Sequence, residues 1–426
     1  MKKNSILFAF ISLISIMVLV QGCKKATVSE LTTTAISEVT LTTAVSGGKI
    51  TSDGGEDILQ KGVCWSTTQS PTIASSITND GNGSTAYTSN LIDLTAGTPY
   101  YVRAYATNSV GTAYGNEVTF ATHEITGAVL NTTEVTTVTS VSAVAGGNIT
   151  DAGGGTITAR GICWGTSPNP TITDNKTTSG TGPGIFTGTL TELTDGTTYY
   201  YRAYATNNSG TTYGQELHFI TPVTDIEGNI YKTVIIDTEV WMAENLKVTK
   251  FNDNVDITLV SDAAEWIGLT NPGFCWYNND PDFNKPVYGA LYNWYAASSA
   301  NICPTGWHAA TNDEYDAMEV SLGLAQADIN IWGWRGTDHG SKMKNTTGWN
   351  SGENGTNTSG FSALPGGYRF YNDGQYNGQN TLGYWWTATE HDADRGWYRR
   401  LDGNNTAVYK ASTDKRAGKA IRCVKD

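Results

Sequence analysis

The first half of the chain is organised by residues 101–108, YVRAYATN, which recur almost unchanged as residues 200–207, YYRAYATN. The same shift of 99 residues places KGVCW at residues 61–65 on RGICW at residues 160–164, and the two matches need no gap between them. Self-similarity at a fixed period is typical of one structural unit present in tandem copies. The sequence therefore predicts two copies of one domain.

Each copy has the pattern of an all-β sandwich. Short alternating stretches are separated by turns rich in Gly, Asn, Asp and Pro, as in antiparallel sandwiches. In the segment from Tyr100 to Ala106, alternate residues beginning with Tyr100 share one face, and this small, apolar face is the predicted core. We therefore expect β-sandwich domains at residues 28–122 and 127–221.

The repeats resemble fibronectin type III domains. Leu94, a Gly-Thr turn and then Tyr100 are similar to the tyrosine corner of that family, and Leu193 with Tyr199 repeats the pattern. The early-strand Trp of the family is missing, and a Trp stands instead beside the single Cys of each repeat. The resemblance implies a divergent immunoglobulin/fibronectin-like fold and a spacer role.

Cys64 and Cys163 lie between apolar and aromatic neighbours, one in each repeat. Neither has a partner within its own repeat, and a lone Cys in such surroundings is usually a small core side chain. We expect both to be buried free thiols.

The N-terminus has the pattern of a lipoprotein signal peptide. Lys2 and Lys3 precede an apolar run at residues 6–20, which is short for a membrane span. VQGC at residues 20–23 resembles a lipobox, which implies cleavage after residue 22 and acylation of Cys23. An ordinary secretory signal is the alternative.

We accordingly expect residues 1–22 to be a signal peptide and residues 23–27 a lipidated tether. The tether would hold the protein in the bacterial cell envelope, at the outer membrane, on its periplasmic or its outer face. Loss of the two lysines changes the formal net charge from −13 to −15. An acidic chain repels phosphate backbones, so nucleic acid is excluded as a partner.

Composition changes after Pro222, since eleven of the 13 Trp residues lie from Trp241 onward. Several phrases resemble the Fibrobacter succinogenes major paralogous domain: VWMAENL at 240–246, CWYNND at 275–280, YGALYNW at 288–294, CPTGWH at 303–308, LPGGYR at 364–369 and YWWTATE at 384–390. The resemblance covers about 200 residues and implies an α+β, C-type-lectin-like fold for residues 223–426. It also implies a disulfide between Cys303 and Cys423, for which Cys275 is the competing partner.

Two helices are expected in this C-terminal domain, defined as residues 223–426. Thr311 and Glu314 form a T-x-x-E capping box before apolar Tyr315 and Met318, with Gly323 as a C-terminal stop. The spacing of Leu291, Trp294 and Tyr295 indicates a second, shorter helix. Long Gly- and Asn-rich loops fill the remainder and have room for function.

No catalytic motif occurs in the sequence, so we expect a non-enzymatic protein without a cofactor. Calcium is an alternative, because two groups of side chains offer oxygen ligands: Asn278, Asn279, Asp280 and Asp282, and Glu390, Asp392 and Asp394. Neither group has EF-hand spacing, and turn-forming or solvated carboxylates are the simpler interpretation.

The ligand surface is predicted near residues 384–397. Trp385 and Trp386 are adjacent, so in a strand their rings face opposite sides and only one can enter a given core. The full candidate set is Trp385, Trp386, Glu390, Asp392, Asp394, Arg395 and Trp397. Rings beside carboxylates and Arg suit a sugar, so we expect non-catalytic recognition of carbohydrate or protein. The alternatives are a structural or assembly protein without a ligand and an envelope hydrolase.

Overall fold

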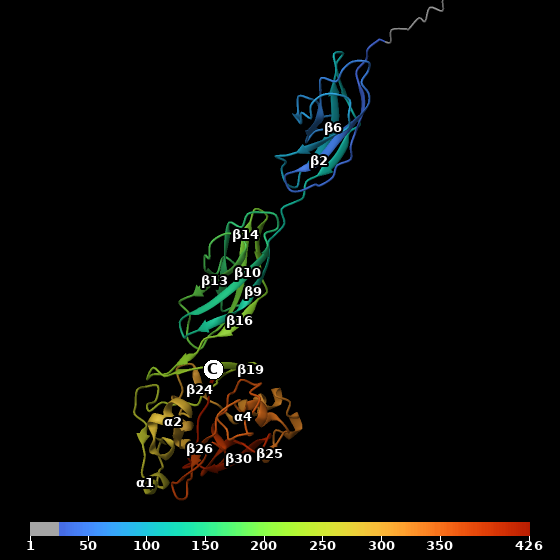
Figure 1. The fold of residues 1–426 in the computed structure, drawn as a ribbon. Coiled ribbons are helices and arrows are strands. Elements are labelled where there is room, and N and C mark those ends of the chain that lie inside the picture. The colour runs from blue at the N-terminus through green and yellow to red at the C-terminus, as the bar shows by residue number, and fades with distance from the viewer. Residues whose placement is uncertain (1–24) are drawn as a thin grey trace, which may run out of the picture. The chain divides into compact units, whose positions relative to one another are not determined.

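The computed structural model describes residues 25–426, so Cys23 and the predicted signal peptide lie outside the described residues. The chain divides into two compact units (Figure 1). One unit comprises the residues up to Thr126 together with Gly153–Gly155. The other comprises Gly127–Ala152 and Thr156–Asp426.

The first repeat is a β-sandwich. Its strands are β1 Glu30–Thr33, β2 Ala44–Ser52, β3 Gln60–Ser66, β4 Ser76–Ile77, β5 Tyr87–Leu91, β6 Pro99–Thr107, β7 Thr112–Tyr114 and β8 Val118–Ala121. One sheet has the order β1-β2-β5, and the other has the order β4-β3-β6-β7 with β8 also paired to β6.

The second repeat has the same topology. Its strands are β9 Val129–Val138, β10 Ala143–Asp151, β11 Ala159–Gly165, β12 Asn175–Lys176, β13 Gly184–Leu190, β14 Thr198–Asn207, β15 Gly210–Tyr213 and β16 Leu217–Ile220. The sheets are β13-β10-β9 and β12-β11-β14-β15, with β16 paired to β14. The prediction of two sandwiches is therefore confirmed.

The predicted core face of β6 is buried, because Tyr100, Val102, Ala104 and Ala106 are each at most 8 % exposed. The tyrosine-corner hydrogen bond is present in the first repeat, where the Thr95 amide donates to the Tyr100 hydroxyl at 3.0 Å. Thr194 and Tyr199 make the equivalent bond at 2.9 Å.

Cys64 and Cys163 are fully buried free thiols, as predicted. Each Sγ donates to a proline carbonyl seven residues later, at 3.3 Å to Pro71 and 3.3 Å to Pro170. Burial raises the pKa of both thiols to about 11. A buried, protonated thiol is a poor nucleophile, so these residues fill the core.

The C-terminal domain combines small sheets with short helices. Its strands are β17 Val223–Thr224, β18 Ile230–Tyr231, β19 Thr233–Ile236, β20 Glu239–Met242, β21 Thr258–Leu259, β22 Gly273–Cys275, β23 Leu291–Tyr292, β24 Trp307–Ala309, β25 Gly333–Arg335, β26 Gly366–Arg369, β27 Tyr376–Gln379, β28 Leu382–Glu390, β29 Arg395–Asp402, β30 Val408–Asp414 and β31 Cys423–Lys425. Its α-helices are α1 Ala263–Ile267, α2 Pro281–Val287, α3 Trp294–Ala297, α4 Asn312–Ser321 and α5 His339–Met343.

The largest sheet of this domain has the order β25-β30-β29-β28-β26-β27. A second sheet, β19-β20-β31-β24, brings the last strand of the chain between the β19–β20 hairpin and β24. Shorter sheets are formed by β21-β22-β23 and by β17-β18. Among residues 25–426, no helix is long and apolar enough to span a membrane.

Helix α4 has the predicted capping box. The Thr311 hydroxyl accepts from the Glu314 amide, and the Glu314 carboxylate accepts from the Thr311 amide at 2.7 Å. Tyr315 and Met318 on its inner face are buried. The second predicted helix begins later than expected, because Leu291 and Tyr292 pair with β22 and Asn293 caps α3.

The predicted disulfide between Cys303 and Cys423 is confirmed, with a Cα–Cα distance of 6.1 Å. It joins the loop before β24 to the first residue of β31 and closes a span of 120 residues. Cys275 is buried and free, so the competing pairing does not occur.

Candidate functional site

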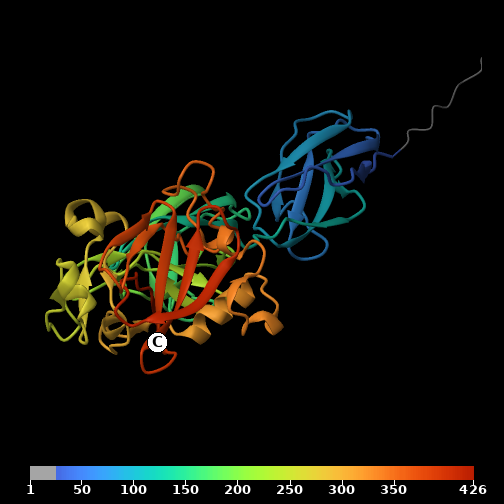
Figure 2. The ribbon, with the colours of Figure 1, turned by 90° about the horizontal axis from the view of Figure 1, so that it is seen from below.

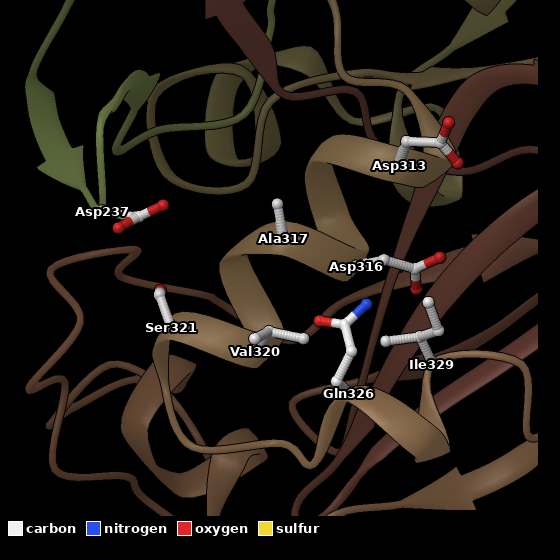
Figure 3. A pocket seen from close by; sticks show the side chains of 8 residues that line it. All are labelled: Asp237, Asp313, Asp316, Ala317, Val320, Ser321, Gln326 and Ile329. Atoms are coloured by element: carbon white, nitrogen blue, oxygen red, sulfur yellow. The ribbon is translucent and has the colours of Figure 1, made fainter.

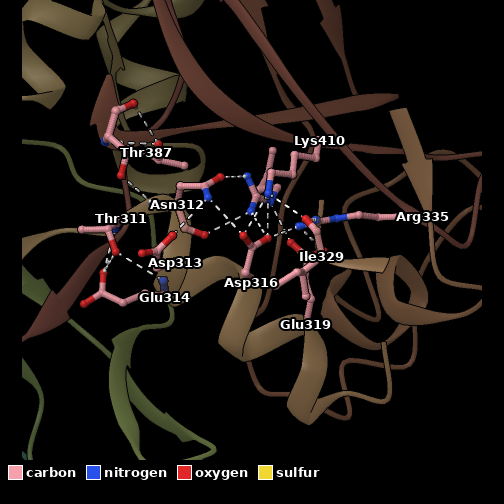
Figure 4. A network of polar contacts seen from close by, with 12 residues as sticks. Thr311, Asn312, Asp313, Glu314, Asp316, Glu319, Ile329, Arg335, Thr387 and Lys410 are labelled. Atoms are coloured by element: carbon pink, nitrogen blue, oxygen red, sulfur yellow. Dashed lines mark hydrogen bonds and ion pairs between the residues drawn. The ribbon is translucent and has the colours of Figure 1, made fainter. Parts of the chain in front are cut away.

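The six-stranded sheet has one face covered by α4, and a buried ion network joins the helix to the strands there (Figure 4). Arg335 of β25, Arg399 of β29 and Lys410 of β30 all bind Asp316 of α4, at 2.6, 2.8 and 2.9 Å. Burial opposes ionisation of Asp316, but the charges of Arg399, Lys410 and Arg335 outweigh it and lower the pKa of this carboxyl. Asp316 is therefore ionised and holds the helix to the sheet.

Glu319, one turn further along α4, shares these cations. It accepts from Arg399 Nε at 2.7 Å and pairs with Arg335 Nη2 at 2.8 Å. The network therefore contains three cations and two carboxylates. Such a buried cluster is stable only while each charge keeps its partners.

A pocket of about 380 Å³ lies beside α4 (Figure 3). Its lining includes Asp313 and Asp316 from α4 and Asp237 from the β19–β20 turn, with apolar Ala317 and Val320 between them. Asp316 is committed to the ion network, so it has no proton to give as a general acid. Of the three carboxylates in the lining, Asp316 is therefore the one that serves the helix–sheet interface.

The prediction of Trp385 and Trp386 as ligand contacts is wrong, because both side chains are fully buried. Their rings do point to opposite faces of β28, but a hydrophobic core covers each of these faces. The indole of Trp385 donates to Asn245 Oδ1 at 2.8 Å, and that of Trp386 donates to the Tyr292 carbonyl at 2.9 Å.

The charged residues of the predicted site form the turn between β28 and β29. Asp392 accepts from the backbone amides of Asp394 and Arg395 and pairs with the Arg395 guanidinium at 2.6 Å. The hydrogen bond from Arg395 lowers the pKa of Asp392. Glu390 is exposed and pairs with Lys415. Most of these charges thus serve turn geometry, along an open groove of about 590 Å³.

Trp397 lies on the α4 side of the sheet and meets a residue that the sequence analysis missed. Its ring centroid is 4.6 Å from that of Trp332 and 4.8 Å from that of His391. Trp332 is 51 % exposed. This cluster is a small aromatic surface at one corner of the sheet.

The opposite face of the sheet is seen in Figure 2, where the strands lie broadside to the viewer. This face is covered at β28, where Trp386 is fully buried and Tyr384 is 8 % exposed, and accessible at β25, where Trp334 is 37 % exposed. Five side chains stand in register across five neighbouring strands, because Trp334 pairs with Tyr409, Tyr409 with Arg400, and Arg400 with Tyr384. Gly367 pairs with Gly383, which places Tyr368 beside Tyr384. We call this set the aromatic row: Trp334, Tyr409, Arg400, Tyr384 and Tyr368.

The members of the aromatic row contact one another. Trp334 and Tyr409 stand edge to face with centroids 5.1 Å apart, and those of Tyr368 and Tyr384 are 4.7 Å apart. The Arg400 guanidinium lies 5.5 Å from the ring of Trp334 and 5.6 Å from that of Tyr384. Four strand spacings of about 4.8 Å make the row about 19 Å long.

The outer part of the row is accessible, since Trp334 is 37 % exposed and the side chain of Arg400 is 27 % exposed. Arg400 pairs with Asp402, so its charge is already balanced. A line of Trp, Tyr and Arg is the composition that interaction surfaces favour. The sequence signal was the WGW triplet at residues 332–334, but the register that completes the row is not encoded locally.

Two of the residues considered for calcium, Asp280 and Asn279, have hydrogen bonds within the protein. Asp280 caps α2 by accepting from the Phe283 amide at 3.2 Å, and Asn279 accepts from the Tyr376 hydroxyl at 2.7 Å. In the part of the chain that the structure describes, no group of three or more His, Cys, Asp and Glu side chains could hold a metal ion.

Comparison with protein families bears on the same domain. Residues 234–425 match the model of the Fibrobacter succinogenes major domain. The matched segment spans α4, the disulfide, the aromatic row and both faces of the six-stranded sheet. No curated protein matches the chain.

Two solved structures are similar to parts of the chain. The chicken CNTN1 FN1–FN3 domains are 11% identical over 46% of this chain and 69% of theirs, with a TM-score of 0.21. A myokine structure is 18% identical over 23% of this chain and 100% of its own, with a TM-score of 0.19.

Proposed function

We propose that the chain is a non-catalytic recognition protein whose C-terminal domain binds carbohydrate along the aromatic row. The observation that carries the proposal is the register of Trp334, Tyr409, Arg400, Tyr384 and Tyr368 across one sheet face, with Trp334 exposed at its end. Pyranose rings have an apolar face that stacks on aromatic side chains, while Tyr and Arg can hydrogen-bond to hydroxyls. A straight row suits an extended glycan chain better than a single sugar.

The exposure of three Trp side chains, one of them in the row, also supports a recognition function. Eight of the eleven Trp residues of the C-terminal domain are buried, which is what a purely structural protein would show. Trp332, Trp334 and Trp397 are not in the core, and leaving such rings on a surface has a cost unless they meet a partner. We therefore favour recognition over a structural role.

We expect Trp334→Ala to weaken glycan binding by at least about tenfold, because an aromatic ring that packs on a ligand typically contributes more than about 1 kcal/mol. The full chain in detergent would be screened on a glycan array, and the affinity for the best hit measured by calorimetry. Trp332→Ala is the matched control, since this residue is more exposed than Trp334, at 51 % against 37 %, but lies with Trp397 on the α4 side. Loss of binding in Trp332→Ala alone would move the site to that side, and binding of proteins but no glycans would contradict the carbohydrate class.

We propose further that the C-terminal domain has a C-type-lectin-like fold. In this proposal two sandwich spacers carry it from a lipid anchor in the bacterial cell envelope, where it serves adhesion. The support is the lipobox-like VQGC at residues 20–23 and the order of the domains. A diacylglycerol plus an amide-linked chain would give stable membrane attachment.

We expect Cys23→Ala to abolish processing at residue 22 and lipid attachment, because the thiol is the acylated group. Detergent phase partitioning and intact mass of the purified protein would report both changes. Cys64→Ala, which removes a core thiol, is the control and should partition like wild type. Unchanged partitioning of Cys23→Ala would refute the anchor.

A further inference from the structure

Lys419 is buried beside Tyr384 and Tyr368, the members of the aromatic row on β28 and β26. Its backbone amide donates to the Tyr292 carbonyl at 2.9 Å, and its carbonyl accepts from the Tyr292 amide at 2.8 Å. Its Nζ lies 4.4 Å from the ring centroids of both Tyr384 and Tyr398, and 5.7 Å from that of Tyr368. Two members of the aromatic row, Tyr384 and Tyr368, therefore flank this amine.

The Lys419 amine has no polar partner. Within residues 25–426, no side chain or carbonyl forms a hydrogen bond or ion pair with Nζ, and the residue is only 3 % exposed. Nζ is not one of the polar atoms in residues 25–426 that lack both a hydrogen bond and solvent contact. The amine is therefore deeply buried but keeps a slight contact with solvent. A buried polar group without a partner is costly, which indicates a site whose partner comes from outside.

The titratable groups that surround the Lys419 amine are three tyrosines and one arginine. Tyr368, Tyr384 and Tyr398 face the amine, and burial raises the pKa of each hydroxyl, so they are neutral at neutral pH. Arg400 is the nearby cation and is paired with Asp402. Burial first, and then the charge of Arg400, lowers the pKa of Lys419 to about 7. The free amine is therefore about half protonated at neutral pH.

We propose that Lys419 is the anion-binding position of the aromatic row and that the ligand is an acidic polysaccharide, one that carries carboxylates on its sugar rings. This inference rests on the proposed function and names its substrate class. The rings of Tyr384 and Tyr368 would hold the sugar, and the ammonium would bind its carboxylate. An acidic peptide offers the same carboxylate but lacks the flat apolar faces that a five-residue aromatic row can stack against.

Binding should be coupled to proton uptake, because only the charged amine attracts a carboxylate and the bound carboxylate then stabilises that charge. Affinity should be highest below pH 7 and should fall as the pH rises through 7. For a free pKa of about 7, and a bound pKa well above it, the affinity at pH 8 is expected to be about tenfold weaker than at pH 6.

The test uses the full chain with a panel of uronic-acid oligomers: galacturonate, glucuronate, mannuronate and guluronate. Each oligomer is compared with its methyl ester, which keeps the sugar chain and removes the charge. We expect the acid to bind at least about tenfold more tightly than its ester at pH 6. Lys419→Met keeps the side-chain length without the charge, and should abolish both this preference and the pH dependence.

The outcomes separate the two proposals. Equal affinity for acid and ester, or a preference that survives in Lys419→Met, overturns the role of Lys419 while leaving carbohydrate binding intact. Binding of poly-glutamate in place of every glycan overturns the substrate class. Failure of all glycans, neutral and acidic, removes the proposed function and the inference with it. The circular dichroism spectrum of Lys419→Met should match wild type, because the change relieves the burial of an amine.

Discussion

Asp316→Asn is expected to lower the free energy of unfolding by about 3–5 kcal/mol, the usual cost of removing one partner from a buried ion pair. Asp316 binds Arg335, Arg399 and Lys410 inside the sheet–helix interface. Without it, Arg335 and Arg399 keep only the carboxylate of Glu319, and Lys410 has no carboxylate partner. Urea unfolding monitored by Trp fluorescence would measure the change.

Asp313→Asn is the matched control, because it makes the same change on the exposed side of α4 and should cost less than about 1 kcal/mol. Lys410→Met in the Asp316→Asn background should recover part of the loss, since it removes one of the uncompensated cations. The two changes would then be strongly non-additive. A small effect of Asp316→Asn, similar to that of the control, would show that the network does not hold the helix.

Replacing both Cys303 and Cys423 by Ala is expected to cost about 2–5 kcal/mol, because the disulfide closes a long loop and restricts the unfolded chain. The bond spans 120 residues and ties β31 to the loop before β24. Since β31 is the central partner of both β20 and β24, its release should also loosen the four-stranded sheet.

Reduction provides the control for this prediction. A thiol reductant should shift the urea midpoint of the wild type toward that of the double variant and should leave the double variant unchanged. The remaining thiols of the described chain, Cys64, Cys163 and Cys275, are buried and free in both proteins, so they do not contribute to the difference. An unchanged midpoint in the double variant would show that packing alone holds β31.

Local sequence patterns predicted the elements that depend on residues close together in the chain. The recurrence of YVRAYATN identified the sandwiches, because the strand, its core face and the tyrosine corner lie within a few residues. Helix α4 was recognised from Thr311 and Glu314, since a capping box needs only neighbours in sequence. The short helices α1, α2 and α5 were missed, because helices of five to seven residues are too short for a periodic pattern.

The candidate ligand site could not be predicted in the same way. Trp385 and Trp386 were expected to offer one exposed ring, and the expectation failed because both faces of β28 carry side-chain layers. Sequence alternation shows that two residues face opposite ways, but not what covers each face. That depends on how α3 and α4 pack on the two sides of the sheet.

The sequence by itself determined the tandem β-sandwiches, the capped helix α4 and, by resemblance, the disulfide. Their signals are periodicity, local hydrogen-bonding residues and family phrases, all of which can be read along the chain. Only the tertiary structure decided that Trp334, Tyr409, Arg400, Tyr384 and Tyr368 form one row and that Lys419 lies beside it. These residues come from distant segments, and their alignment follows from strand order and register, which are fixed by packing of the whole domain.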